Sequence, residues 1–174
     1  MVGVEITAGT HDILLFSSAG KSIRFKESDV RSVGRTAIGV RGIRLATNDK
    51  VVSLIVAEST DPILTATEKG YGKRTQLDEY RTQARGGSGV ISIKTSDRNG
   101  QVVGAIQVTD DDEMMLISNK GTLVRARAAD VSIIVRNTQG VTLINIAEDE
   151  ELVSVAKIAE SDEEGEEEET VTES

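Results

Sequence analysis

An internal repeat of about 50 residues constrains the fold of this chain more than any other feature of its sequence. One string, Asp12–Gly20, recurs as Pro62–Gly70 and Glu113–Gly121; a second, Arg35–Val40, as Arg85–Val90 and Arg136–Val141; a third, Val51–Val56, as Val102–Val108 and Leu152–Ile158. Chance similarity would not keep three strings in one register. The sequence therefore predicts three stacked copies of one supersecondary unit.

Each copy has the pattern of short β-strands. In the first repeat, Ile13–Phe16 is a short apolar run, Ser17–Gly20 has the composition of a turn, and Ser22–Phe25 alternates polar and apolar residues. Four short strands in about 50 residues is the size of a propeller blade. The period favours an all-β, propeller-like array, with a β-solenoid or consecutive sandwiches as alternatives.

The period also sets the expected boundaries of the units. Three blades are predicted, at residues 11–58, 59–109 and 110–159. Val2–Val4 matches Val52–Leu54, so residues 1–10 are predicted to be the last strand of a preceding blade in a longer array. The alternative is that this strand completes the final repeat.

The charge is divided between a neutral body and an acidic tail. The chain has 20 Lys and Arg against 29 Asp and Glu, a net charge of −9, but residues 160–174 hold nine of the acids and no base. The body therefore carries as many bases as acids, and its charge does not exclude a nucleic acid as a partner. The tail has too little apolar surface to form a core, so it is predicted to be disordered.

Composition excludes several classes of function. The chain has no cysteine and a single histidine, His11, so it lacks the residues for a disulfide framework, a cysteine zinc site, a thiol nucleophile or a histidine-based catalytic triad. It has no apolar run long enough to span a membrane and no secretory signal. We expect a cytoplasmic protein with no membrane partner, no catalytic residues, no metal and no cofactor.

Basic residues recur in register with the repeat. Arg24, Arg74 and Arg125 form one such set, and Arg35, Arg85 and Arg136 form another. In an array of similar blades these positions form a stripe along one edge, which suits a polyanion such as duplex DNA. The predicted DNA-binding residues are Arg24, Arg35, Arg41, Arg44, Lys73, Arg74, Arg85, Lys94, Arg125, Arg127 and Arg136. The alternative is a solvated surface with local Arg–Asp pairs.

Two further features bear on the choice of ligand. The chain has only two Phe, two Tyr and no Trp, which argues against stacking of single-stranded bases. The glycine-rich segment 85–89 offers backbone amides beside an arginine and could approach a phosphate closely. A tight turn that needs positive φ explains the same glycines equally well.

These residues resemble a known family. The 50-residue period, Gly34–Leu45 and Arg136–Val141 are similar to the C-terminal domain of the A subunit of bacterial DNA gyrase. The resemblance implies a six-bladed β-pinwheel whose blades exchange strands, of which this chain is expected to hold the second half, about three four-stranded blades, followed by the acidic tail that also occurs in the family. Gln83–Gly89 has the frame of the family's gyrase motif but lacks two of its bases.

The resemblance also implies a function. DNA wraps around the basic rim of such a disc, which supports ATP-dependent negative supercoiling by a type II topoisomerase. The expected partners are duplex DNA and the remainder of gyrase, both the rest of its A subunit and its B subunit. The catalytic tyrosine domain and the ATPase subunit lie outside this sequence, so the chain alone is expected not to be an enzyme. The alternatives are the equivalent domain of topoisomerase IV and a propeller scaffold for protein partners.

Overall fold

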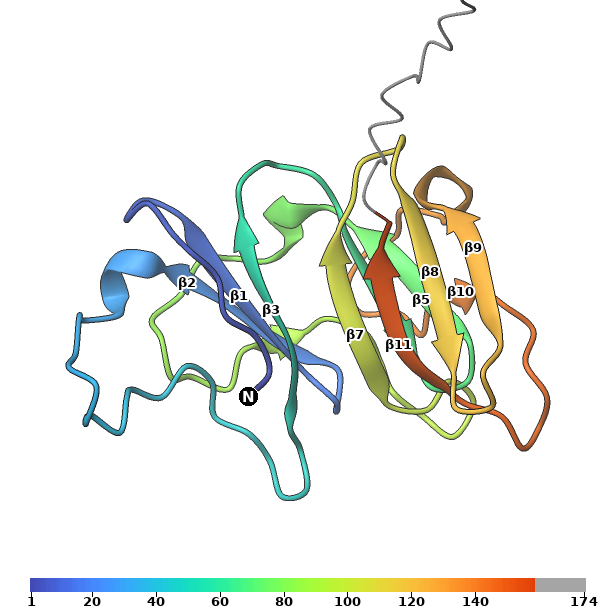
Figure 1. Cartoon of the computed structure of the whole chain (residues 1–174), viewed down its shortest axis with the longest axis horizontal. Helices are drawn as coiled ribbons and strands as arrows, with labels where there is room; N and C mark the ends of the chain where they lie inside the picture. The colour runs from blue at the N-terminus through green and yellow to red at the C-terminus, as the bar shows by residue number, and fades with distance from the viewer. Residues whose placement is uncertain (159–174) are drawn as a thin grey trace, which may run out of the picture.

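The computed structural model describes residues 1–158, and the predicted disordered tail lies outside the described residues. Three antiparallel sheets hold the strands (Figure 1). In order across each sheet, the first holds β3 (Val51–Ala57), β1 (Asp12–Ser17), β2 (Lys21–Lys26) and β6 (Val90–Ile91); the second holds β10 (Val141–Thr142), β5 (Tyr71–Thr75), β4 (Ile63–Thr67) and β7 (Val102–Gln107); the third holds β11 (Leu152–Lys157), β8 (Glu113–Ser118) and β9 (Leu123–Arg127). A single 3-10 turn follows the second strand of each repeat: η1 (Glu27–Asp29), η2 (Leu77–Glu79) and η3 (Ala128–Asp130).

Neighbouring repeats exchange strands. β6 comes from the second repeat but pairs with β2 of the first sheet, and β10 comes from the third repeat but pairs with β5 of the second. The first two sheets are therefore four-stranded only because the following repeat supplies the outermost strand. The predicted all-β, propeller-like pinwheel is confirmed. Within residues 1–158, the third sheet has three strands, and the matching segment of the first repeat, residues 40–41, forms none.

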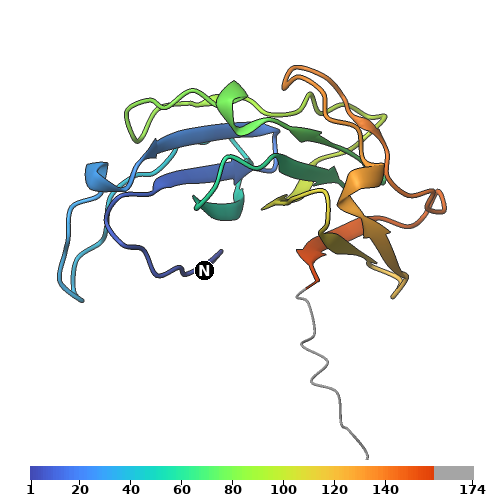
Figure 2. The same cartoon turned by 90° about the horizontal axis from the view of Figure 1, so that it is seen from above.

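The three sheets follow one another along an arc (Figure 2). The inner strands β3, β7 and β11 contact one another in sequence, so they form the hub side. The segments around residues 80–100 run along the convex side of the arc, and the N-terminus lies on the concave side. Residues 1–10 form no strand there, and the Glu27 carboxylate accepts hydrogen bonds from the Thr7 hydroxyl and from the Gly9 amide (3.0 Å). Their assignment to a preceding blade stays a prediction.

The core lies between successive sheets. Period-2 alternation places Leu14 and Phe16 on the face of the first sheet that meets the second, where they pack with Ile63 and Tyr80. The Phe16 and Tyr80 rings meet edge to face, with centroids 5.8 Å apart. A second cluster, which includes Leu64 and Leu116, joins the second and third sheets in the same way. Each fully buried side chain of this size contributes about 1.5–3 kcal/mol, so the joints between sheets stabilise the array.

Candidate nucleic-acid interface

The site is built on the chain segments that link each 3-10 turn to the following inner strand, residues 31–47, 81–98 and 132–147, which we call the outer connections. They lie side by side through backbone hydrogen bonds: the Arg44 amide donates to Gly87 (2.8 Å) and the Lys94 amide to Thr138 (2.8 Å). The three segments thus form one continuous band across the repeats. β6 and β10 are parts of this band.

The outer connections concentrate positive charge. The first carries four arginines and no acid, the second carries four bases and one acid, and the third carries one arginine and no acid. The neutral body is therefore strongly basic along this band. The excess of bases falls from the first repeat to the third.

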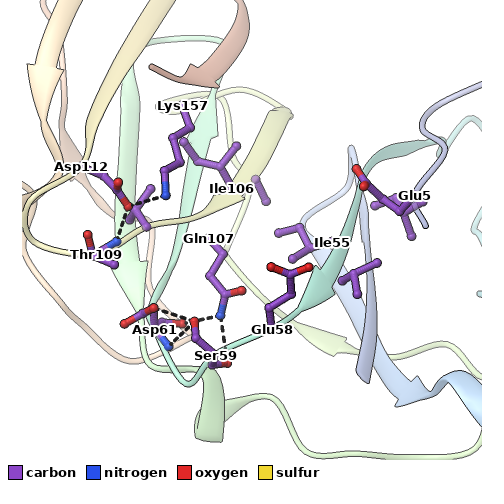
Figure 3. A pocket seen from close by; sticks show the side chains of 14 residues that line it. Glu5, Ile55, Glu58, Ser59, Asp61, Ile106, Gln107, Thr109, Asp112 and Lys157 are labelled. Carbon is purple, nitrogen blue, oxygen red and sulfur yellow. Dashed lines mark hydrogen bonds and ion pairs between the residues drawn. The ribbon is translucent and has the colours of Figure 1, made fainter. Parts of the chain in front are cut away.

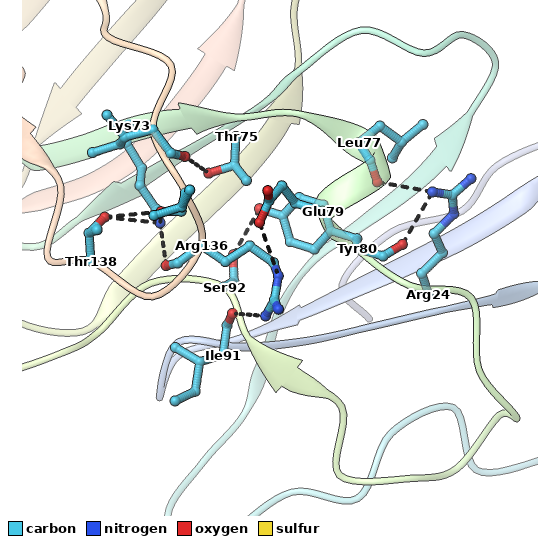
Figure 4. A network of polar contacts seen from close by, with 12 residues as sticks. Arg24, Lys73, Thr75, Leu77, Glu79, Tyr80, Ile91, Ser92, Arg136 and Thr138 are labelled. Atoms are coloured by element: carbon cyan, nitrogen blue, oxygen red, sulfur yellow. Dashed lines mark hydrogen bonds and ion pairs between the residues drawn. The ribbon is translucent and has the colours of Figure 1, made fainter.

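The first in-register arginine set joins repeats together. Arg24 binds Asp12 through Nε (2.7 Å) and donates to the carbonyl oxygens of Leu77 (2.9 Å) and Tyr80 (3.2 Å) in the second repeat (Figure 4). Arg74 is buried and donates in the same way to the Val131 carbonyl (2.8 Å) of the third repeat. These donors are used inside the protein, so Arg24 and Arg74 differ from the expectation of a DNA-facing stripe.

Arg125, the third member of this set, lies on the third sheet. Its guanidinium pairs with Glu113 on the neighbouring strand, and its side chain is 63% exposed. Arg127 is also exposed and pairs with Asp130 (3.0 Å). Both side chains therefore reach solvent, but each carries an acidic neighbour.

The second in-register set reaches back to the preceding repeat. Arg85 donates to the carbonyl oxygens of Asp29 (3.1 Å) and Arg41, and Arg136 donates to that of Ile91 (2.7 Å). Arg41 and Ile91 are equivalent positions, so both arginines make the same contact one repeat apart. Arg35, the first member of the set, is exposed.

Lys73 has a role that the sequence analysis missed. Its buried ammonium donates to the carbonyl oxygens of Val135 (2.6 Å) and Arg136 in the third repeat (Figure 4). Burial, with the nearby Arg136 charge, lowers the pKa of Lys73 from 10.5 to about 8. The signal for this role is a lysine at a position that is apolar in the other repeats, Ile23 and Val124.

Several bases on the outer connections remain exposed. Arg35, Arg41, Arg44 and Lys94 are predicted residues whose side chains donate no hydrogen bond within residues 1–158. Arg31 and Arg81 share this environment and were missed. The pairs Arg31/Arg81 and Arg44/Lys94 are each 50 residues apart, so a search for in-register bases limited to the first two repeats would find them.

The glycine-rich segment serves contact between repeats. Gly86 has a φ of 84°, and its amide donates to the Gly42 carbonyl (2.7 Å). Gly89 has a φ of 70°, and a Cβ there would overlap the Ser22 carbonyl oxygen. Positive φ favours glycine at both positions, and close packing against Ser22 also requires it at Gly89. The Gly86 amide is occupied, so it is not an open phosphate donor.

The hub side has the opposite charge. A pocket between the inner strands β3 and β7 is lined by Glu5, Glu58, Asp61 and Asp112, with Lys157 as its one base (Figure 3). Lys157 pairs with Asp112 at 2.7 Å. Burial alone would raise the pKa of Asp112, but the hydrogen bonds from Lys157 and Thr109 lower it, so this carboxylate stays ionised. The outer band is therefore rich in bases, whereas the hub side is rich in acids.

Two kinds of feature are absent from the described residues. Among residues 1–158, no three His, Asp or Glu side chains are grouped so that they could hold a metal ion. No helix in the described part of the chain is long and apolar enough to cross a membrane.

Comparison with known proteins gives a consistent result. The family model described as DNA gyrase C-terminal domain, beta-propeller, matches residues 11–58, 61–109 and 112–159. The DNA gyrase A subunit of Klebsiella oxytoca is 59% identical over 160 residues, which are 92% of this chain and 18% of that protein. The DNA gyrase A subunit of Escherichia coli is 56% identical over the same share of each chain. The chain thus spans about a fifth of the length of these relatives.

Two solved structures share the fold. A DNA gyrase A C-terminal domain matches with a TM-score of 0.82 and 30% identity, over 88% of this chain and 52% of that one. The C-terminal domain of a DNA topoisomerase IV matches with a TM-score of 0.85 and 28% identity, over 90% of this chain and 49% of that one. Since the family model covers all three repeats, and the repeats exchange strands as a pinwheel does, this chain belongs to the DNA gyrase C-terminal domain family of β-propellers.

Proposed function

We propose that this chain is a non-catalytic module that binds and wraps duplex DNA along its outer connections. The observation that carries the proposal is the separation of charge: exposed bases on the outer band and acids at the hub. Arg31, Arg44, Arg81 and Lys94 recur one repeat apart on this band, and no carboxylate within residues 1–158 pairs with them.

The contacts are expected to be with phosphates. Guanidinium and ammonium groups neutralise backbone charge and release counterions, so affinity does not depend on base sequence. No aromatic residue lies on the three outer connections to stack on an unpaired base. Because the band follows a convex arc, a duplex that contacts its whole length must bend, and the contacts offset the cost of bending.

In a complete enzyme, the module would act with other domains. The relatives named above are A subunits of DNA gyrase, of which this chain matches a small part. We infer that it acts in the cytoplasm with the rest of the gyrase A subunit, together with the gyrase B subunit. Wrapping would there present a DNA segment to the strand-passage machinery and so support ATP-dependent negative supercoiling by a type II topoisomerase.

The equivalent domain of topoisomerase IV is the second candidate, because a solved domain of that enzyme has a TM-score of 0.85. Sequence favours gyrase, since the Klebsiella oxytoca gyrase protein is 59% identical, against 28% for the topoisomerase IV structure. A scaffold for protein partners is the third candidate. It predicts no salt-dependent binding to DNA.

A salt titration of duplex binding tests the proposal. We expect the triple variant Arg44→Ala, Arg81→Ala, Lys94→Ala to bind more weakly and to lower the slope of log K against log salt by up to about 2.7, since each phosphate contact contributes about 0.9. The matched control is Lys50→Ala, Lys69→Ala, Lys120→Ala, which removes three exposed bases outside the band. Equal losses in both variants would mean that net charge, and not the outer band, governs binding.

A further inference from the structure

One position at the start of each outer connection carries a base in two repeats and none in the third. Thr82 and Ile133 form parallel bridges to the preceding repeat, at matching residues of β2 and β5, so the two are equivalent. The residue before each of them is Arg81 or Ser132, and the same position in the first repeat is Arg31. All three of these side chains are exposed. The third repeat therefore has a hydroxyl where the other two have a guanidinium.

A second position, near the end of each outer connection, changes in the same way. The amides of Ile93 and Ile144 donate to the glycines that precede β2 and β5 (3.3 and 3.2 Å), so these isoleucines are equivalent. The residue after each of them is Lys94 or Asn145, and the same position in the first repeat is Arg44. These three side chains are also exposed. The third repeat therefore has a neutral amide where the other two have a cation.

The turn that follows the third outer connection is acidic. Residues 148–151 are four acids in a row, and they lead into β11. The corresponding turn of the second repeat, residues 98–101, has one base and no acid, and that of the first, residues 47–50, has one of each. Lys120 pairs with one of the four acids, Asp149, and the turn stays negative. The loss of bases and the gain of acids thus change the charge of the third repeat in the same direction.

This contrast does not depend on whether a repeat has a neighbour. The second repeat lies between two others, and its Arg81 and Lys94 are exposed all the same. Both positions therefore face solvent when repeats are docked on either side. Ser132 and Asn145 differ from their counterparts in residue type, and not in how much of the side chain is covered.

We propose that a bound duplex is held by the first two outer connections and leaves the band at the third. This inference rests on the proposed function, because it concerns DNA contacts along the same band. Arg31, Arg44, Arg81 and Lys94 can each neutralise a phosphate and release a counterion, whereas hydroxyl and amide groups can hydrogen-bond a phosphate but neutralise no charge. The acids of residues 148–151 repel phosphates over about 8 Å, the Debye length at physiological salt. The duplex path is therefore shorter than the band.

Cross-linking from matched positions tests where the duplex leaves the protein. The chain has no cysteine, so Ser32→Cys, Thr82→Cys and Ile133→Cys each supply a single thiol for a short photoactivatable cross-linker in the full chain. The three positions correspond in the repeat, and all are exposed. With a duplex of random sequence, we expect cross-linking from Ile133→Cys to be at least tenfold lower than from the other two. Equal cross-linking from all three positions would overturn the proposal.

Restoring the two bases tests whether charge sets the exit point. We expect Ser132→Arg with Asn145→Lys to raise cross-linking from Ile133→Cys at least tenfold, and to steepen the slope of log K against log salt by up to about 1.8. The matched control is Thr122→Arg with Val153→Lys, which adds the same charge at exposed positions outside the band. Equal gains from both pairs, or no gain from the first, would overturn the proposal. A natural chain that binds no duplex would instead overturn the proposed function, and this inference with it.

Discussion

Arg24 and Arg74 turn their guanidinium groups to carbonyl oxygens of the following repeat, whereas Arg125 at the same position pairs with Glu113 in solvent. A guanidinium is removed from water at low cost only when its donors are satisfied, and the end of a 3-10 turn supplies carbonyl oxygens for this purpose. An arginine at this position of the repeat therefore either binds the next repeat or reaches solvent, depending on whether another repeat covers it.

The buried ammonium of Lys73 predicts a pH dependence. Its pKa is lowered to about 8 from 10.5, so between these values the unfolded chain holds a proton that the folded chain has released. The unfolded state then binds more protons, and the free energy of unfolding rises with pH. We expect wild-type protein to gain stability relative to Lys73→Met as pH rises from 8 to 10.5, and none below, measured by urea unfolding. Parallel profiles of the two proteins would show that burial does not shift this pKa.

At the scale of elements, the exchanged strand is the feature that joins one repeat to the next. β6 and β10 have two residues each, so their few ladder bonds are supported by the flanking glycines and by the arginines of the joint. Gly89 brings the backbone of β6 against Ser22 of β2, where no side chain fits.

Two glycine variants separate the effect of this close backbone contact from the effect of positive φ. Gly89→Ala and Gly39→Ala both place an alanine at positive φ, which costs about 1–2 kcal/mol, but only Gly89 meets a neighbouring carbonyl. We expect Gly89→Ala to lower the free energy of unfolding by clearly more than Gly39→Ala, measured by urea unfolding. Similar losses would mean that backbone conformation alone requires the glycine.

At the scale of the whole molecule, stability comes from the interfaces between sheets. Each repeat contacts only its neighbours, so the stability of the array is close to a sum of repeat and joint terms. The joint between the second and third sheets combines the Leu64–Leu116 cluster with the Arg74 and Lys73 contacts. Breaking that joint should release the third sheet while the first two stay associated.

Alanine variants of Arg74 and Arg125, which occupy equivalent positions in two repeats, test the contribution of this joint to stability. Arg74→Ala removes a buried guanidinium and leaves the Val131 carbonyl without its donor, and we expect it to lower the free energy of unfolding by about 1.5–3 kcal/mol. Arg125→Ala removes an exposed ion pair and should change the free energy of unfolding by less than about 1 kcal/mol. Hydrogen exchange should show the loss of protection in Arg74→Ala concentrated in β8, β9 and β11. Uniform loss across all three sheets would argue for a single cooperative unit.

The sequence alone predicted the repeat, the β-strands and the excess of bases between them. The repeat is visible as similar segments about 50 residues apart, and the strands are visible as local alternation of polar and apolar residues. The exchanged strands came from the resemblance to a family, since no local pattern shows that Val90 pairs with Ser22. Sequence patterning also located Arg35, Arg41, Arg44 and Lys94 on the exposed band, although their contact with DNA stays a proposal.

Only the tertiary structure decided which in-register bases face solvent. Arg24, Lys73, Arg74, Arg85 and Arg136 carry the same charge as the exposed bases, but each donates to carbonyl oxygens more than 40 residues away. Lys73 and Arg74 are buried, and Arg24, Arg85 and Arg136 are half-buried. These contacts depend on how one repeat docks on the next, and the spacing of charges along the chain does not encode that docking. Periodicity therefore determines that the arginines form rows, and packing between repeats determines whether a row is surface or interior.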